Sequence, residues 1–261
     1  MKILFLGDVN GGPGRRVIKE RLRAMRDELG VAAVVANGEN AAAGNGITVT
    51  LAKELIDSGV DVITLGDHAW GQKELVGTIG QCPQMLRPAN GGPGQPGRGW
   101  DVFTTPLARF AVVNLLGRTF MGPADCPFRM ADEILNAIPK DVPVFVDFHA
   151  EATSEKIAFA YHLDGRVAAV VGTHTHVQTS DARVLEKGTA FITDLGMCGP
   201  YISSIGRDLG PVLHKFTTGM PARFEMAGGP ATLEGAVVEV DPATRLAKSI
   251  SSIRFRDPVS K

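Results

Sequence analysis

The N-terminal part of the chain repeats one pattern three times: a short apolar run, a glycine with a polar residue soon after it, and a segment of helical periodicity. Strands separated by helices of this length predict right-handed crossovers and a mostly parallel sheet. Loops at the carboxyl ends of such a sheet carry ligand-binding groups. The predicted strands are Lys2–Leu6, Val31–Ala36 and Val62–Leu65, and the predicted helices are Arg15–Leu29, Val49–Ser58 and Gln72–Ile79.

The second half of the chain follows the same rule less regularly, which places the protein in the α/β class. Its 261 residues suit one large domain or two small ones, and since no internal repeat or linker divides them, we predict a single domain over residues 1–261. The predicted strands are Trp100–Thr104, Ala111–Leu115, Val142–Phe148 and Val167–Val171, the helices are Met130–Ile138 and Ser154–His162, and an antiparallel hairpin joins Ala236–Val240 to Ala247–Ile253.

The charge balance restricts the partners that the protein can bind. The chain has 27 Lys and Arg against 28 Asp and Glu, a formal net charge of -1, which disfavours a broadly basic nucleic-acid surface and a polybasic membrane patch. No apolar stretch approaches the ~18 residues of a membrane span. Asp8 interrupts the apolar start before a signal-peptide core can form. Three cysteines without a C-x-x-C pair predict no disulfide framework. We therefore expect a cytoplasmic protein without a membrane partner.

Residues of metal-binding type gather at the predicted strand ends. Carboxylate, amide and imidazole groups suit Mn, Fe, Zn and related divalent ions. These groups are more numerous than one tetrahedral or octahedral ion can use, so two metal ions are predicted. The polar residues at the strand ends are Asp8, Glu39, Asn40, Asp67, His68, His149, His174 and His176.

His174 and His176 form an H-x-H motif after the predicted strand Val167–Val171. In a chain with six histidines such a pair is expected by chance about 0.14 times, so the motif is suggestive and gains weight from its position after a strand. Residues two apart point to the same side of an extended segment. The spacing therefore predicts that both imidazoles face one site.

As an ordered set, the strand-end motifs resemble those of the calcineurin-like metallophosphoesterases, and more closely their bacterial YmdB-like branch of 2′,3′-cyclic-nucleotide phosphodiesterases. The resemblance covers nearly the whole chain, including Leu65–Trp70 and Asp194–Met197. The motifs that carry it are Gly7-Asp8, Gly38-Glu39-Asn40, Gly66-Asp67-His68, a strand ending in His149, and Gly172-Thr173-His174-Thr175-His176.

The resemblance implies a four-layer αββα sandwich with mixed, mostly parallel sheets and a dinuclear metal centre at the strand ends. A metal-bridging hydroxide would attack phosphorus, while His68 would act as the general acid that protonates the departing oxygen. The ions would be Fe or Mn, with Mg or Zn as alternatives. One ion would take Asp8, Glu39, Asn40 and His176, and the other would take Glu39, Asp67, His149 and His174, so that Glu39 bridges both.

This chain departs from the wider superfamily in three places. The superfamily usually has Asp-x-His where this chain has Asp8-Val9-Asn10, and usually a bridging Asp where this chain has Glu39; both features are those of the YmdB-like branch. The third departure is specific to this chain, because the family's Gly-Asn-His is here Gly66-Asp67-His68. We hypothesise that the extra carboxylate of Asp67 tightens metal binding, weakens the attraction for an anionic phosphate and raises the pKa of metal-bound water.

The expected activity is hydrolysis of small phosphodiesters, with 2′,3′-cyclic nucleotides as the substrate class. A phosphomonoesterase or a nuclease with the same centre remains an alternative. We expect loops such as Gly91–Gly99 and Gly117–Pro127 to select the substrate, and their sequences contain no motif that identifies it. Another alternative is a regulatory scaffold that binds nucleotide or RNA without turnover, against which the complete ligand set and His68 argue. The near-neutral charge disfavours long nucleic acid. A homo-oligomer is compatible with the sequence.

Glycine is enriched, at 31 of 261 residues, and four glycines lie just before predicted ligands. These are Gly7, Gly38, Gly66 and Gly172. We interpret each as a strand end where the backbone turns to aim a ligand, and where the missing Cβ leaves room for metal and phosphate.

Overall fold

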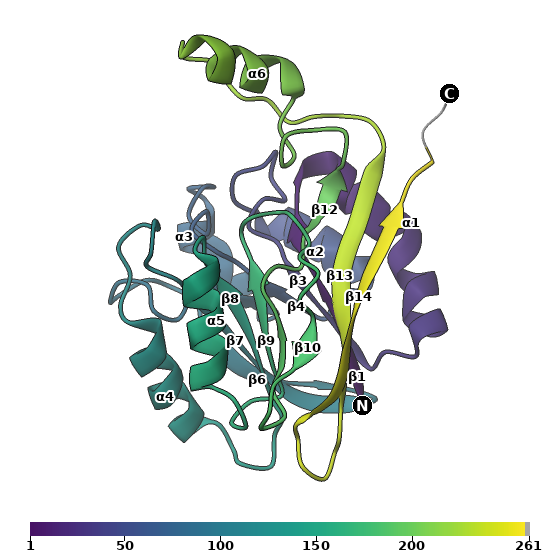
Figure 1. Ribbon diagram of the computed structural model, residues 1–261, viewed down its shortest axis with the longest axis vertical. Coiled ribbons are helices and arrows are strands. Elements are labelled where there is room, and N and C mark those ends of the chain that lie inside the picture. Colours follow the sequence, from purple (N-terminus) through teal and green to yellow (C-terminus); the bar gives the residue numbers. More distant parts are fainter. Residues whose placement is uncertain (259–261) are drawn as a thin grey trace.

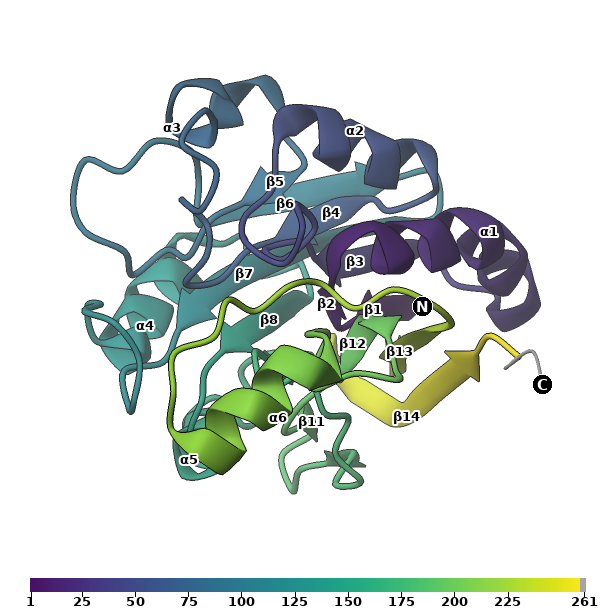
Figure 2. The same ribbon diagram turned by 90° about the horizontal axis from the view of Figure 1, so that it is seen from above.

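Two β-sheets lie face to face, and helices cover the outer face of each sheet (Figure 1, Figure 2). The computed structural model describes residues 1–258, so the last three residues of the predicted domain 1–261 lie outside the described part. Three clusters of buried apolar side chains fill the spaces between the layers. The predicted four-layer αββα sandwich is confirmed.

The first sheet contains β1 (Lys2–Leu6), β2 (Asp8–Val9), β3 (Ala33–Asn37), β4 (Val62–Thr64), β5 (Met85–Leu86), β12 (Met197–Pro200), β13 (Ala231–Val240) and β14 (Ala247–Arg256). Their order is β2-β12-β13-β1-β3-β4-β5, with β14 paired to β13. Strands β1, β3 and β4 run parallel, as the repeated pattern predicts, and β5 adds a fourth parallel strand. The predicted C-terminal hairpin is present as β13 and β14, and β13 joins the sheet antiparallel to β1.

The second sheet contains β6 (Trp100–Thr105), β7 (Ala108–Leu116), β8 (Val144–His149), β9 (Ala169–Thr173), β10 (Arg183–Val184) and β11 (Ala190–Ile192). Their order is β10-β11-β9-β8-β7-β6. The four central strands are parallel and the two edge strands are antiparallel to their neighbours. The sheets are therefore mixed and mostly parallel, as expected.

The helices cover the two outer faces of the sandwich. Helices α1 (Gly11–Leu29) and α2 (Val49–Asp57) pack on the first sheet, and α4 (Pro127–Ala137) and α5 (Thr153–His162) pack on the second. Between the sheets, the rings of Phe5 and Phe145 lie 5.4 Å apart, centre to centre. The short α3 (Leu75–Thr78) continues as a 3-10 turn to Gln81. The last helix is α6 (Leu209–Thr218).

The structure corrects the bounds of several elements. Helix α1 begins at Gly11 and not at Arg15, because the first helical turn needs no N–H partners and so accepts Pro13. Gly14 lies so close to the backbone of Cys198 that a Cβ would be 2.1 Å from its carbonyl oxygen. Sequence analysis did not predict helix α6 or the strands β2, β5, β10, β11 and β12. Each of these strands has only two to four residues, too few for a clear periodic pattern.

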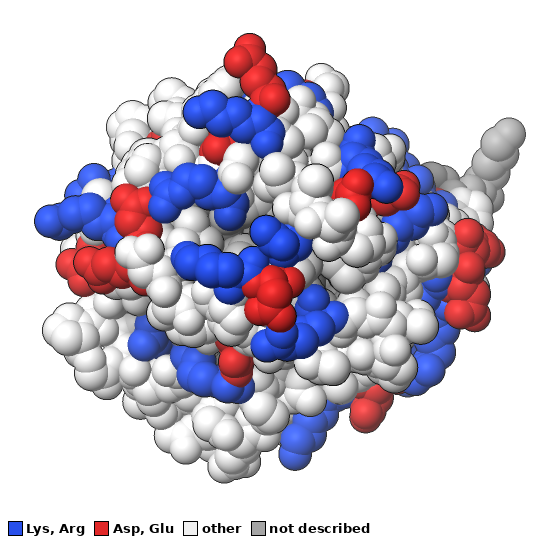
Figure 3. Space-filling view, turned by 90° about the horizontal axis from the view of Figure 1, so that it is seen from below, with Lys and Arg blue, Asp and Glu red and all other residues white. Residues whose placement is uncertain are grey.

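Helix α6 projects from the rest of the molecule (Figure 1), and Val212 is its buried residue. Leu213 and Phe216 on this helix are 56% and 76% exposed. Viewed from the opposite end, the surface shows Lys and Arg interspersed with Asp and Glu, so this face has no uniformly basic surface (Figure 3). Among residues 1–258, no helix is both long and apolar enough to cross a membrane.

Candidate metal centre

All eight predicted site residues lie in one cluster at the end of the sandwich. The predicted ligands follow parallel strands of both sheets, whose carboxyl ends meet there. Direct contacts connect the cluster: His149 with Asp67, His174 with Asp8, His176 with Asn40, and His68 with Glu39.

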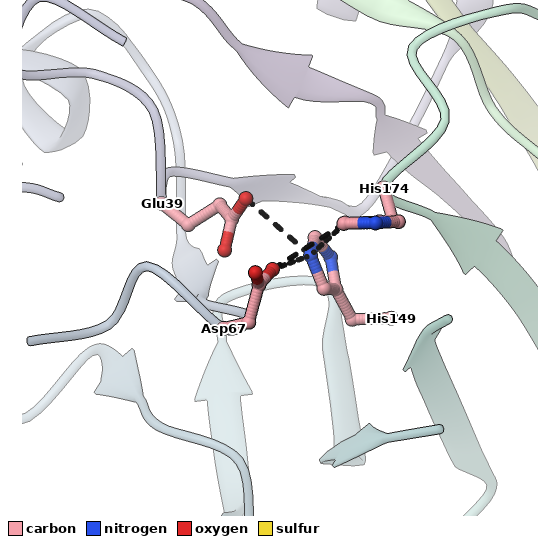
Figure 4. A group of neighbouring side chains, drawn as sticks. All are labelled: Glu39, Asp67, His149 and His174. Carbon is pink, nitrogen blue, oxygen red and sulfur yellow. Dashed lines mark hydrogen bonds and ion pairs between the residues drawn. The ribbon is translucent and has the colours of Figure 1, made fainter. Parts of the chain in front are cut away.

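Four of these residues have their ligand atoms within 4.8 Å of one another: Glu39, Asp67, His149 and His174 (Figure 4). His149 Nε2 lies 3.0 Å from Asp67 Oδ1, 3.3 Å from Glu39 Oε1 and 3.0 Å from His174 Nδ1. Burial lowers the pKa of His149, but the charge of Glu39 and the hydrogen bond with Asp67 together raise it well above its ordinary value. Two carboxylates and two imidazoles that converge in this way can hold a divalent cation.

The other predicted ligands, Asp8, Asn40 and His176, lie next to this group. Asp8 is fully buried, and its Oδ1 has no hydrogen-bond partner among residues 1–258, although His176 Nε2 lies 3.8 Å away. Burial raises the pKa of Asp8 to about 6. A buried carboxylate oxygen without a partner is unfavourable unless a cation or donor satisfies it. Asp8 therefore fits the role of a metal ligand in a cluster that also contains imidazoles.

Asn40 turns its amide nitrogen towards the other predicted ligands. Its Nδ2 lies 2.9 Å from Glu39 Oε1 and 3.2 Å from His176 Nε2, while its Oδ1 lies 2.9 Å from His68 Nδ1. Since only the amide oxygen can coordinate a cation, binding of a metal by Asn40 requires rotation of the amide.

Hydrogen bonds behind the cluster fix which imidazole nitrogen faces the ligand atoms. Thr173 Oγ1 donates to Asp147 Oδ1 at 2.6 Å and accepts from His149 Nδ1 at 2.9 Å, which leaves His149 Nε2 for a cation. His176 Nδ1 likewise donates to the Ile205 carbonyl at 2.9 Å. The sequence did not identify these supporting residues.

The H-x-H motif faces one site for a different reason from the predicted one. His174 and His176 are not extended: their φ angles are 103° and 63°, in the left-handed region. Such a conformation costs about 1–3 kcal/mol per non-glycine residue and persists only where the surroundings hold it. A turn thus sends His174 to Asp67 and Glu151 and His176 to Asp8 and Asn40.

Only one of the four highlighted glycines borders the ligand atoms. A Cβ at Gly66 would lie 2.3 Å from Glu39 Oε2 and from His149 Nε2. At Gly7 and Gly172 a Cβ would collide with backbone carbonyl oxygens, and at Gly38 with Ile63. The missing Cβ of Gly66 therefore leaves room for the ligand side chains, whereas the other three glycines permit close packing of the chain.

A cavity of about 270 Å³ opens over the cluster. Its lining includes Glu39, His68 and His174, and also two charged residues that sequence analysis missed, Glu151 and Arg207. Neither the loop of residues 91–99 nor that of residues 117–127, which we expected to select the substrate, contributes to this lining. Within the described part of the chain, Arg207 is the only Lys or Arg lining the cavity, and its Nη2 donates to the Gly44 carbonyl at 2.7 Å.

The Asp8→Asn variant is expected to be more stable than the parent protein in the absence of metal. Because the folded pKa of Asp8, about 6, lies above its unfolded value, ionised Asp8 destabilises the fold, and stability is lost as the pH rises from about 4 to about 6. The gain should reach up to about 3 kcal/mol at pH 8 and shrink towards pH 4.5. Urea unfolding with a chelator present measures it. The control is Asp27→Asn on the exposed face of α1. An equal gain in stability in this control would contradict the effect assigned to Asp8.

A family model described as YmdB-like protein matches residues 4–253. A Bacillus subtilis (strain 168) protein named 2′,3′-cyclic-nucleotide 2′-phosphodiesterase is 47% identical over 258 residues, which are 98% of each chain.

Two solved structures are similar to the whole chain. A hypothetical protein from Thermus thermophilus has a TM-score of 0.92 and 41% identity, covering 99% of this chain and 100% of that one. A novel phosphatase from Mycoplasma pneumoniae has a TM-score of 0.92 and 36% identity, covering 98% of this chain and 93% of that one. The similarity therefore extends over the entire sandwich.

Proposed function

The chain belongs to the YmdB-like family, and from this membership we propose that it hydrolyses small phosphodiesters with two divalent metal ions, 2′,3′-cyclic nucleotides being the substrate class. The relatives described above include a phosphodiesterase and a phosphatase; the chain, too, is a hydrolase. The observation that carries the proposal is the convergence of Glu39, Asp67, His149 and His174 within 4.8 Å, beside a buried Asp8 oxygen to which no described residue donates a hydrogen bond.

In this proposal Glu39 would be shared between two ions, since its Oε1 contacts both His149 and Asn40, which belong to different ligand sets. Bound divalent ions would supply a nucleophile at neutral pH and neutralise charge on the phosphoryl oxygens. Fe or Mn suits the mixed carboxylate and imidazole donors, and Mg or Zn is the alternative. One ion would be held by Asp8, Glu39, Asn40 and His176, and the other would be held by Glu39, Asp67, His149 and His174.

His68 is the proposed general acid. Its backbone N–H donates to Glu39 Oε2 at 2.9 Å, and its side chain is 40% exposed in the cavity that a substrate would enter. A hydrogen bond with Glu39 raises the pKa of His68, so the imidazole holds a proton that Nε2 can donate to the departing oxygen.

The position of Arg207 supports the proposal that the substrate is an anion. Among the described residues that line the cavity, its guanidinium is the one permanent positive charge beside carboxylates and imidazoles. A volume of about 270 Å³ is near the lower end of small-molecule sites, about 300–1,000 Å³. Both features favour a single nucleotide over a long nucleic acid.

Turnover measured on a panel of phosphate esters tests the proposal. The Mn-loaded protein should hydrolyse 2′,3′-cAMP faster than 3′,5′-cAMP, a phosphomonoester or a short RNA, and Asp8→Ala should abolish this activity. Preference for the monoester would favour a phosphatase, the name given to the Mycoplasma pneumoniae relative. Preference for RNA would favour a nuclease. Binding without turnover of any substrate would favour a regulatory scaffold.

Location and assembly complete the proposal. We place the protein in the cytoplasm, where nucleotide substrates occur, and propose a homo-oligomer because Leu213 and Phe216 expose apolar surface on α6. Light scattering on the purified protein tests the oligomer, and a monomer at micromolar concentration would contradict it.

Asp67→Asn is expected to weaken Mn²⁺ binding by at least about tenfold, because it removes one negative charge from a site that holds two cations. The acidic limb of the pH–rate profile should move to lower pH. Calorimetric titration with Mn²⁺ and a pH series on 2′,3′-cAMP measure the two effects. If neither the affinity nor the acidic limb changes, the carboxylate of Asp67 does not have the proposed effect.

A further inference from the structure

The turn Thr173–His176 carries two of the proposed metal ligands in an unusual conformation. His174 and His176 both have left-handed φ angles, 103° and 63°, which residues other than glycine rarely adopt. Thr175 lies between them. Some feature of the fold must therefore hold this turn, since each imidazole would otherwise leave its position opposite the carboxylates.

A fully buried ion pair lies directly beneath the turn. Lys156 of α5 and Asp194, which follows β11, are both 0% exposed, and Lys156 Nζ lies 2.8 Å from Asp194 Oδ2. The same carboxylate oxygen accepts hydrogen bonds from Thr175 N at 3.1 Å and from Thr175 Oγ1 at 2.8 Å. Lys156 Nζ also donates to the Thr173 carbonyl at 2.8 Å. The pair thus binds the residue on each side of His174.

The packing at the end of β9 brings the pair close enough to make these bonds. Gly172 lies against Thr193, and a Cβ at Gly172 would be 1.8 Å from the Thr193 carbonyl oxygen. Asp194, the next residue, is fixed further because its Oδ1 accepts a hydrogen bond from Gly196 N at 2.9 Å.

We propose that Lys156 and Asp194 are positioning residues that hold the Thr173–His176 turn so that both imidazoles face the metal centre; this inference rests on the proposed function. The pair touches neither imidazole and acts through the backbone of Thr173 and through Thr175. A purely stabilising role explains its location poorly, because apolar residues of similar size often replace a buried ion pair without loss of stability.

The decisive experiment compares Mn²⁺ affinity with stability in the double variant Lys156→Met/Asp194→Leu. This variant removes both charges together and so leaves no unpaired charge in the core. We expect the metal-free variant to keep the circular dichroism spectrum of the parent protein, while calorimetric titration shows Mn²⁺ binding weakened 10- to 100-fold, about the loss seen when groups supporting a metal ligand are removed. The control Arg26→Met/Asp61→Leu removes a partly buried ion pair that does not contact the turn and should leave Mn²⁺ affinity unchanged.

Thr175 provides an independent test if the double variant does not fold. Thr175→Val removes only the hydroxyl that donates a hydrogen bond to Asp194, and it should weaken Mn²⁺ binding about tenfold. Thr175→Ser keeps this hydroxyl and should bind Mn²⁺ with the affinity of the parent protein. Parent-like Mn²⁺ affinity in a folded double variant or in Thr175→Val would overturn the positioning role. A parent protein that binds no Mn²⁺ would instead refute the metal centre itself, so the two failures are distinguishable.

Discussion

Glu39→Gln is expected to remove metal binding and to lower phosphodiester hydrolysis by at least about 10³-fold, because a bound metal contributes several kcal/mol to catalysis. Glu39 is buried, and its Oε1 lies 3.3 Å from His149 Nε2 and 2.9 Å from Asn40 Nδ2. It therefore contacts members of both proposed ligand sets. Glutamine has the same shape as glutamate but has neither the charge nor a second oxygen. This one substitution should therefore weaken the binding of both ions.

Metal content and activity measured on the same samples test this expectation. Elemental analysis after loading with Mn²⁺ should find less than one ion per chain in Glu39→Gln. Glu20→Gln, on the exposed face of α1, is the matched control and should resemble the parent protein. The proposed bridge would be wrong if Glu39→Gln bound two ions with parental affinity, and the site would not be a metal centre if the parent protein bound none.

The α/β class and the parallel strands could be predicted from the residues, whereas the four-layer arrangement was implied by the family resemblance. The apolar runs of β1, β3 and β4 alternate with helical segments early in the chain, and such alternation permits few topologies. The same reasoning places polar residues such as Asp8 and Asp67 at one end of the sheet. Contacts among these residues then follow from the fold and require no further information from the sequence.

The supporting residues could not be predicted, because their partners lie far away in the sequence. Asp147 receives hydrogen bonds from Thr64, Thr173 and Asn37, which belong to both sheets. One signal was present, since a carboxylate inside the apolar run Val142–Phe148 is expensive to bury without partners. That signal marks a buried polar network but not its members.

The rim of the cavity was missed for another reason. Arg207 lies in a segment between β12 and α6 that has no periodic pattern, and a single arginine in such a segment predicts nothing. Its position over the metal centre depends on how the segment folds back onto Gly44. Only the tertiary structure contains that information.

His68→Ala is expected to slow hydrolysis of 2′,3′-cAMP by about 10²- to 10⁴-fold, the contribution typical of a general acid. The reason is the leaving group: a ribose oxygen departs poorly as an alkoxide and needs the proton that His68 Nε2 can donate. Bis(4-nitrophenyl) phosphate has a leaving group that departs without a proton. The same variant should therefore lose less than about tenfold on that substrate.

The loss of activity on 2′,3′-cAMP, divided by the loss on bis(4-nitrophenyl) phosphate, distinguishes acid catalysis by His68 from a structural role. Alanine keeps the backbone hydrogen bond from residue 68 to Glu39 Oε2, 2.9 Å long in the parent protein, so the ligand loop should be preserved. Mn²⁺ affinity measured alongside verifies this, and His214→Ala on α6, away from the cavity lining, is the control. Equal losses on both substrates would mean that His68 does not donate the proton. A large loss confined to the cyclic nucleotide would assign that proton to His68, because no other change in the variant depends on the basicity of the leaving group.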